Sequence, residues 1–258
     1  GRLLIVDCGV LFPEENQPGV DLILPDFGPI IDRLDDIEAV VLTHGHEDHI
    51  GAVAHLWPRL RCPVYATPFT ARLLRGKLEE AELETRVRVK VVPLGGQVTL
   101  GPFALEFISI THSIPEPNAV AIRTPLGVVV HTGDWKLDPE PQLGEVTDDR
   151  ALRKLGEEGV LACVCDSTNA LVLGESGSEA EVKAALHRLI GSLKGRVAVT
   201  AFASNVARLQ SVAEAAREAG REIVLVGRAM RHMVACAKET GYLRDFPRVL
   251  EEEEAPRL

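Results

Sequence analysis

The sequence predicts an α/β protein with two parts: sheets packed between helices, followed by an α/β domain with a parallel sheet. In residues 1–166, many short apolar runs bounded by glycine and proline indicate strands, with a few helical stretches among them. From residue 160 onward, strands and helices alternate regularly with short turns, which is typical of a parallel sheet. We therefore expect one domain at 1–166 and a second at 167–258.

The strands of the first domain are predicted from apolar runs that end in small or polar residues. The runs 3–9 and 37–43 are of this kind, and both end where chemically functional side chains begin. Further strands are expected at 62–66, 87–92, 97–100, 103–110, 119–123 and 127–131. Helices fit residues 49–58, 68–83 and 149–157. Glycine and proline between these runs mark the turns.

The second domain is predicted from a regular series of alternating elements. A strand at 160–166 and a small polar stretch precede the series. The expected elements are a helix at 178–193, a strand at 196–201, a helix at 204–219, a strand at 222–226 and a helix at 228–240. Gly195, Gly220 and Gly227 lie at the short turns between them, as a parallel βαβα arrangement requires.

Composition places the chain among ordinary globular proteins. It has 258 residues, of which 46% are hydrophobic and 26% charged, and this excludes a disordered or collagen-like chain. No window approaches the roughly 18 unbroken apolar residues of a membrane span, so we expect no membrane association and a cytoplasmic location. The five cysteines lack CxxC spacing, which argues against a disulfide framework or a thiolate zinc finger.

Charge is unevenly distributed along the chain. The net charge is −10, and the acidic excess lies in residues 1–165. Once the acidic run 251–254 is set aside as a solvated tail, residues 166–258 are slightly basic. This weakly favours contact between a polyanion and the second domain.

A cluster of metal-binding residue types follows the strand at 37–43. The sequence Thr43-His44-Gly45-His46-Glu47-Asp48-His49 holds three imidazoles and two carboxylates within six residues. Burying so many polar atoms without partners costs about 1–3 kcal/mol each, and a divalent metal compensates directly. Imidazole and carboxylate suit zinc, and two-metal hydrolytic sites hold their ions roughly 3.5–4 Å apart. We therefore expect a metal site here, with room for two ions, rather than a polar surface loop.

Three further residues lie at or near the ends of predicted strands. His112 follows the strand at 103–110, and Asp134 follows the strand at 127–131. Strand ends commonly deliver ligands, so the cluster at 44–49 favours a metal-binding role for both. Asp7 is equally able to touch a metal or to orient ligand histidines from behind.

Together these motifs resemble the metallo-β-lactamase superfamily, and within it bacterial ribonuclease J of the β-CASP branch. The resemblance covers nearly the whole chain, and five short motifs stand in the expected order. They are Leu11-Phe12-Pro13-Glu14, the stretch from Thr43 to Ala52, His112-Ser113-Ile114-Pro115, His131-Thr132-Gly133-Asp134 and Asp166-Ser167-Thr168-Asn169. The resemblance implies a partial αββα sandwich that lacks its first strands, followed by an incomplete β-CASP domain.

The resemblance also implies a ligand set for two zinc ions, with manganese as the alternative metal. His44, His46 and His112 would hold one ion, Asp48 and His49 the other, and Asp134 would bridge them. A bridging hydroxide would be the nucleophile, since zinc lowers the pKa of bound water toward 7. Asp48, Asp134 and Asp166 are the candidate catalytic residues. Asp166 is equally well explained as a strand-end residue that caps the next turn.

A substrate-binding loop is expected in the second domain. Phe202, Ala203, Ser204 and Asn205 lie between the strand at 196–201 and the helix at 204–219. Backbone N–H groups at a helix N-terminus can accept a phosphate, helped here by the side chains of Ser204 and Asn205. In ribonuclease J the matching loop contacts RNA near its phosphate.

The chain departs from the family in what it lacks. Family members have a further histidine ligand after the β-CASP domain, and a C-terminal domain, and neither is present here. We therefore expect this chain to be part of a longer protein, truncated at both ends. By itself it could lack activity.

The function that this resemblance implies is a zinc-dependent ribonuclease of RNA maturation and decay. It would combine endonuclease with 5′-to-3′ exonuclease activity on 5′-monophosphorylated, single-stranded RNA, as a homodimer or homotetramer. The alternative within the superfamily is a small-molecule hydrolase of the thioesterase, lactonase or β-lactamase type, which does not need the inserted domain at 167–258. A non-catalytic RNA-binding scaffold is a third hypothesis. The presence of six candidate ligands argues against it: His44, His46, Asp48, His49, His112 and Asp134.

Overall fold

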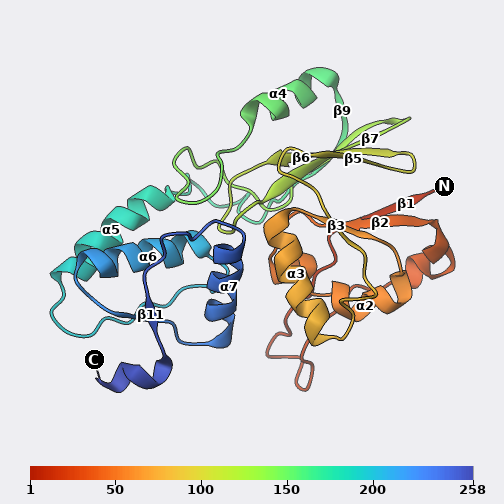
Figure 1. Cartoon of the computed structure of the whole chain (residues 1–258). Helices are drawn as coiled ribbons and strands as arrows, with labels where there is room; N and C mark the ends of the chain where they lie inside the picture. Colours follow the sequence, from red (N-terminus) through yellow and green to blue (C-terminus); the bar gives the residue numbers. More distant parts are fainter. Residues whose placement is uncertain (258) are drawn as a thin grey trace. The chain divides into compact units, whose positions relative to one another are not determined.

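The computed structural model describes residues 1–257, and contacts within it form two compact units (Figure 1). It confirms the predicted α/β class. The first unit comprises Gly1–Ile110, Glu116–Trp135 and Asp148–Ser167. The second comprises Thr111–Pro115, Lys136–Thr147 and the chain from Thr168 onward. The chain thus passes between the two units several times, for the last time after Ser167.

The first sheet of the first unit is entirely parallel. Its strands run in the order β1 (Leu3–Val6), β2 (Ile37–Val41), β3 (Val64–Ala66) and β4 (Val89–Val91). A 3₁₀ segment, η1 (Gly28–Asp36), leads into β2. Residues Ala39, Val40 and Val41 are fully buried, so β2 is covered on both faces, as strands of parallel sheets usually are.

The second sheet is mostly antiparallel. Its order is β5 (Gln97–Leu100), β6 (Phe103–Ser109), β7 (Asn118–Thr124), β8 (Gly127–His131) and β9 (Val160–Val164), and only β8 and β9 pair in parallel. Its inner face packs on the first sheet, where Phe107 and Val120 share one apolar cluster with Ala39, Val41 and Tyr65. Two sheets packed face to face around such a cluster form a sandwich.

Helices cover both outer faces of this sandwich. Figure 1 shows α2 (Val53–Leu60) and α3 (Pro68–Glu80) on the side of the first sheet away from β5–β7. On the other side, α4 (Asp149–Glu158) packs Leu155 against a cluster from β6, β7 and β8. The layers are therefore helix, sheet, sheet, helix, which confirms the predicted αββα arrangement.

One predicted helix of the first unit is divided. The sequence predicts a helix at 49–58, whereas the structure has a short α1 (Glu47–Ile50) followed by α2. The reason is that backbone groups of this segment form hydrogen bonds with the backbone of residues 8–10. The Ala52 N–H donates to the Cys8 carbonyl at 3.0 Å, and the Glu47 carbonyl accepts from Val10 at 3.1 Å.

The second unit contains three helices and a short parallel sheet within the described residues. The helices are α5 (Glu179–Ser192), α6 (Val206–Glu218) and α7 (Arg228–Glu239), all close to their predicted ranges. The strands β10 (Ile223–Val224) and β11 (Val249–Leu250) pair in parallel, and η2 (Glu252–Arg257) follows. Within residues 1–257, no helix is both long and apolar enough to span a bilayer.

The predicted strand at 196–201 is wrong, because this segment joins no sheet in the structure. Its alternating valines are typical of a strand, but the segment lines a cavity of about 820 Å³ together with residues 222–226. The two segments border the same space and do not pair with one another in a sheet. The strand predicted at 222–226 shortens to the two residues of β10, which pair with β11.

Candidate metal centre

Two histidines lie just beyond the C-terminal end of β2. His44 is fully buried, and its Nε2 atom is 3.0 Å from Nδ1 of His46. The two rings meet edge to face, with centroids 4.7 Å apart. Because β2 is buried on both faces, the loop that leaves it starts from a fixed position and brings these two nitrogens to the same point.

Asp7 and Thr43 orient the histidines from behind. Asp7 adopts a left-handed backbone conformation with φ of 61°, which aspartate tolerates better than most residues. Its Oδ1 accepts the Thr43 N–H at 2.7 Å, and its Oδ2 accepts the Thr43 hydroxyl at 2.8 Å. The Thr43 hydroxyl is in turn 3.0 Å from Nδ1 of His44. This arrangement leaves Nε2 as the nitrogen that His44 presents to the centre.

His49 lies among three carboxylates. Its Nδ1 is 2.7 Å from Oδ2 of Asp7, and its Nε2 is 3.2 Å from Oδ1 of Asp134 and 3.7 Å from Oδ2 of Asp48. Burial lowers the pKa of His49, but the hydrogen bonds that the ring donates to Asp134 and Asp7 outweigh this effect and raise the pKa to about 10. The same negative field that favours a proton on the ring favours a divalent cation at Nε2.

A glycine allows the histidine loop to lie directly against the segment after β1. A Cβ atom built on Gly9 would lie 1.7 Å from the Asp48 carbonyl oxygen, so no other residue fits without movement. Next to Gly9, the Cys8 N–H donates to the His49 carbonyl at 2.7 Å. The backbone of Asp48 and His49 is thus fixed, while the Asp48 side chain remains 55% exposed.

Asp134 reaches the centre from the end of β8. Gly133 before it has a left-handed φ of 59°, and a Cβ atom there would lie 2.9 Å from the Asn118 carbonyl. Asn118 in turn donates its own N–H to the Thr43 carbonyl at 3.1 Å. Asn118, the first residue of β7, therefore contacts both the segment after β2 and the segment after β8, beside the site.

His112 is carried by the short loop between β6 and β7. This loop belongs by contacts to the second unit, but it is covalently joined to the first unit at both ends. The Ile110 N–H donates to the Pro117 carbonyl at 3.1 Å and closes its base. His112 is therefore attached to the sheet whose strand β8 leads to Asp134.

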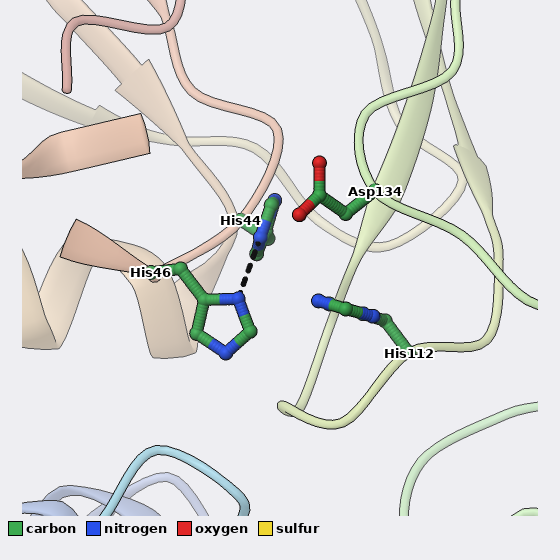
Figure 2. A group of neighbouring side chains, drawn as sticks. All are labelled: His44, His46, His112 and Asp134. Atoms are coloured by element: carbon green, nitrogen blue, oxygen red, sulfur yellow. Dashed lines mark hydrogen bonds between the residues drawn. The ribbon is translucent and has the colours of Figure 1, made fainter. Parts of the chain in front are cut away.

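Two groups of side chains share Asp134 and could each hold a metal ion. Figure 2 shows the rings of His46 and His112 and the Asp134 carboxylate directed toward a common space, with the ring of His44 beside them. Within each group all ligand atoms lie within 4.8 Å of one another. The first group is His44, His46, His112 and Asp134, and the second is Asp48, His49 and Asp134.

The donor atoms fit zinc in kind and in spacing. Zinc binds imidazole nitrogen and carboxylate oxygen at about 2.0–2.2 Å, so neighbouring ligand atoms of a tetrahedral site are roughly 3.3 Å apart. The contact between His44 and His46, at 3.0 Å, and the contact between His49 and Asp134, at 3.2 Å, are close to this spacing. The residues present therefore fit the ions that the sequence predicts.

Asp166 lies outside both groups. It follows β9, and its backbone N–H donates to the Thr132 hydroxyl at 3.0 Å. Thr132 is two residues before Asp134, so Asp166 belongs to the same end of the sheet without joining the possible ligands among residues 1–257. Its predicted catalytic role stays a prediction.

The predicted substrate loop precedes α6 in the second unit. The Asn205 side-chain oxygen accepts the Arg208 N–H at 2.9 Å, so Asn205 is the N-cap of this helix. Its oxygen is therefore engaged, and the groups left for a phosphate are its amide nitrogen and the Ser204 hydroxyl. Phe202 is 84% exposed, and Ala203 and Ser204 are half-buried. The substrate-binding role of this loop stays a prediction.

Sequence reasoning missed the residues that support the site. Thr43 stood next to the first histidine, and Gly9 came two residues after Asp7, so both were adjacent to visible motifs. Asn118 carried no signal, because its contact with Thr43 spans 75 residues. Such contacts depend on how the two sheets meet and have no local pattern.

Comparison with known proteins agrees with this geometry. The β-lactamase superfamily domain matches residues 5–154, which is more than half of the chain. The chain belongs to the β-lactamase superfamily. A second match is narrower: the β-CASP domain of ribonuclease J matches residues 194–257. The resemblance predicted from the motifs is thereby confirmed.

Curated relatives named ribonuclease J are similar over nearly the whole chain. Ribonuclease J of Sinorhizobium meliloti is 48% identical over 251 residues, covering 97% of this chain and 44% of the relative. That of Corynebacterium glutamicum is 49% identical, covering 94% and 34%. That of Thermus thermophilus is 43% identical, covering 100% and 46%. The chain thus spans less than half the length of these relatives.

One solved structure has a similar fold. It is a protein of unknown function from Enterococcus faecalis, with a TM-score of 0.62 and 18% sequence identity. The match covers 92% of this chain and 62% of that one. At this identity the similarity supports the fold alone.

Proposed function

We propose that the protein is a metal-dependent ribonuclease that hydrolyses phosphodiester bonds in single-stranded RNA. The observation that carries the proposal is the pair of possible ligand groups that share Asp134. This centre occurs in a chain whose C-terminal part resembles the β-CASP domain of ribonuclease J. A small-molecule hydrolase would need the first of these features but not the second.

Two zinc ions, with manganese as the alternative, are the cofactors we propose. His44, His46 and His112 would hold one ion, Asp48 and His49 the other, and Asp134 both. Bound in this way, the ions would lower the pKa of water toward 7 and neutralise charge on the attacked phosphodiester. We further propose catalytic roles for Asp48, Asp134 and Asp166.

The side chains around the histidines fix which nitrogen each ring presents. With its hydroxyl hydrogen directed to Asp7, Thr43 can accept a hydrogen bond from the Nδ1–H group of His44. Asp7 likewise accepts from Nδ1 of His49. In both rings Nε2 then has its lone pair available for a metal. Such hydrogen bonds fix the tautomer and raise the basicity of the ligand.

Further parts of the proposal concern substrate and assembly. We propose a domain boundary at residue 167 and a phosphate-binding role for Phe202, Ala203, Ser204 and Asn205, which lie within the stretch that resembles the β-CASP domain, residues 194–257. We propose both endonuclease and 5′-to-3′ exonuclease modes in RNA maturation and decay, in the cytoplasm, with a dimer or tetramer as the working form. Light scattering of the purified protein measures the last of these directly.

A comparison of substrates tests the proposal. The protein, in the full length that its gene encodes, is incubated with 5′-monophosphorylated RNA, 5′-triphosphorylated RNA, a thioester and a lactam. We expect cleavage of RNA, faster from the monophosphorylated end, and no turnover of the small molecules. Turnover of the thioester or lactam without RNA cleavage would favour the small-molecule hydrolase instead.

Two histidine variants distinguish loss of a metal ligand from the general effects of a substitution. His46→Ala removes a proposed ligand and should lower RNA cleavage by at least about 100-fold, because the ion that it helps to hold is lost. His55→Ala is the matched control, since His55 is exposed on α2 and belongs to neither ligand group. Equal activity of the two variants would contradict the assignment. RNA binding, measured separately by gel shift, should persist in both.

A further inference from the structure

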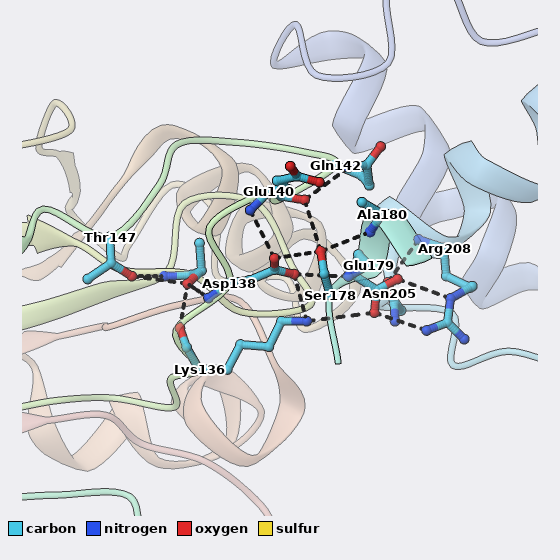
Figure 3. Close-up of polar contacts among 11 residues, drawn as sticks. Lys136, Asp138, Glu140, Gln142, Thr147, Ser178, Glu179, Ala180, Asn205 and Arg208 are labelled. Carbon is cyan, nitrogen blue, oxygen red and sulfur yellow. Dashed lines mark hydrogen bonds and ion pairs between the residues drawn. The ribbon is translucent and has the colours of Figure 1, made fainter. Parts of the chain in front are cut away.

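A buried carboxylate in the second unit, Asp138, lies at the centre of a polar network that the roles above do not use. The residue is only 5% exposed. Figure 3 shows its side chain among polar groups of Lys136, Glu140 and the first turn of α5. Burying a carboxylate costs free energy unless hydrogen-bond donors contact its oxygens. The donors to Asp138 therefore show which segments it connects.

Four donors converge on Asp138. Oδ1 accepts the Ser178 hydroxyl at 2.8 Å and the Glu140 N–H at 3.0 Å. Oδ2 accepts the Glu179 N–H at 3.0 Å and lies 3.1 Å from the Lys136 ammonium. Two of these donors belong to the N-terminus of α5 and two to the segment around Asp138. The carboxylate therefore fastens this segment to the start of the helix, where the helix dipole also favours a negative charge.

The segment fastened in this way holds Thr111, the residue immediately before His112. The Lys136 N–H donates to the Thr111 carbonyl at 2.9 Å, and the Thr111 hydroxyl donates to the Lys136 carbonyl. The Asp138 N–H donates to the same hydroxyl at 3.3 Å. Thr147 accepts the Thr111 N–H at 3.1 Å. Thr111 is 2% exposed, so both its backbone and its side chain are fixed.

The network continues from α5 into α6. The Glu179 carboxylate accepts two hydrogen bonds from the Arg208 guanidinium, at 2.9 and 3.2 Å. It also lies 3.9 Å from the Lys136 ammonium. Two cations and two carboxylates thus balance in a partly buried cluster. A cluster of this kind resists movement of any one member, because moving it leaves a buried charge without its partner.

We propose that Asp138 is a positioning residue for the metal centre. It fastens the segment 136–140 to α5, that segment fixes Thr111, and Thr111 fixes the backbone that carries His112. The inference rests on the proposed function, since it takes His112 as a metal ligand. Asp138 would touch neither the metal nor the substrate, so its effect appears first in metal affinity.

The expected size of the effect follows from how strictly metal sites depend on ligand placement. A ligand must be held within about 0.5 Å of its productive position. Loss of groups that orient a ligand commonly costs 10–100-fold in metal affinity. Because Asp138 acts through Thr111, we expect Asp138→Ala to weaken zinc binding about tenfold, at the lower end of this range.

Competition with a chromophoric chelator measures this affinity in the full-length protein. Cobalt substitution adds a second measurement, because its absorption bands report the geometry of the ligands. We expect Asp138→Ala to weaken zinc binding and to change the cobalt spectrum. Thr147→Val, which removes the acceptor for the Thr111 N–H but no charge, should act in the same direction. This second variant keeps the test valid if Asp138→Ala does not fold.

Glu214→Gln is the matched control. It removes the Lys183–Glu214 ion pair between α5 and α6, at 2.6 Å, and leaves all contacts of Asp138 in place. The control should bind zinc like the unmodified protein. If it weakens binding as much as Asp138→Ala, general loosening of α5 explains the effect and the inference is wrong.

The remaining outcomes separate this inference from the proposed function. If the unmodified protein binds zinc and the folded variants bind it equally well with unchanged cobalt spectra, only the role of Asp138 is refuted. If the unmodified protein binds no divalent metal, the proposed metal centre itself fails. In that case His46→Ala would also change nothing.

Discussion

At the scale of single residues, the metal centre depends on a close approach that only glycine permits. Gly9→Ala would place a methyl group where the Asp48 carbonyl oxygen now lies. Because the loop must shift to make room, we expect a loss of about 1–3 kcal/mol in the free energy of unfolding. Zinc binding should weaken as well. Urea denaturation and a chelator competition measure the two effects.

Gly156→Ala supplies the comparison for this substitution. Gly156 lies in α4, and a Cβ atom there would meet nothing within 4 Å. Alanine in a helix interior should therefore stabilise the protein, by about 0.5–1 kcal/mol. If Gly9→Ala lowers the free energy of unfolding and Gly156→Ala raises it, the result supports close packing at Gly9. If Gly9→Ala leaves the free energy of unfolding unchanged, the histidine loop is free to move.

Residues with local signals could be predicted, and residues defined by distant contacts could not. The candidate ligands from His44 to His49 form one dense motif, so the sequence predicts their grouping directly. Asp138 has no such motif, because its partners Ser178 and Glu179 lie about forty positions away. Its burial follows from the path of the segment over α5, which no residue pattern encodes.

At the scale of elements, Asp138 makes the start of α5 sensitive to acid. Burial raises the pKa of its carboxyl group. Hydrogen bonds from Glu179, Ser178, Glu140 and Lys136 outweigh this effect and lower the pKa to about 2. A carboxyl group whose pKa falls on folding stabilises the protein above its unfolded pKa, near 3.8. That stabilisation is lost as the pH falls through about 2.

Asp138→Asn tests the acid sensitivity. Above pH 5 the variant should be less stable than the unmodified protein, because it lacks the ionised carboxylate. As the pH falls from about 4 toward 2, the difference between the two should shrink, since the aspartate becomes protonated. Urea denaturation at a series of pH values measures this difference. A gap that stays constant down to pH 2 would show that the charge of Asp138 contributes nothing.

The elements themselves were predictable where packing agreed with local pattern. The helices α5, α6 and α7 follow their apolar spacing and begin or end at the expected turns. The segment 196–201 has the alternation of a strand, but it joins no sheet and instead lines a cavity together with residues 222–226. A strand requires a partner, and a sequence pattern does not show whether that partner is in reach.

At the scale of the whole molecule, the αββα arrangement places three strand ends at one edge of the sandwich. The ends of β1, β2 and β8 carry Asp7, His44 and Asp134. Asp7 accepts a hydrogen bond from Thr43, the residue before His44, and Asp134 contacts His49. The sequence predicts the strands and the order of the motifs. The packing of one sheet on the other brings these motifs together into a site. This packing could be predicted from the resemblance to a known family, but not from local propensity.

Because the candidate ligands come from several strand ends, metal binding should stabilise the fold as a whole. At a free zinc concentration 100 times the dissociation constant, binding adds about 2.7 kcal/mol to the free energy of unfolding. For a domain of this size that corresponds to a rise in Tm of roughly 5–10 °C. Calorimetry with zinc and with a chelator measures the shift. We expect the shift in the unmodified protein and in His55→Ala, and its loss in His46→Ala. A full shift in His46→Ala would mean that zinc stabilises the protein from some other site.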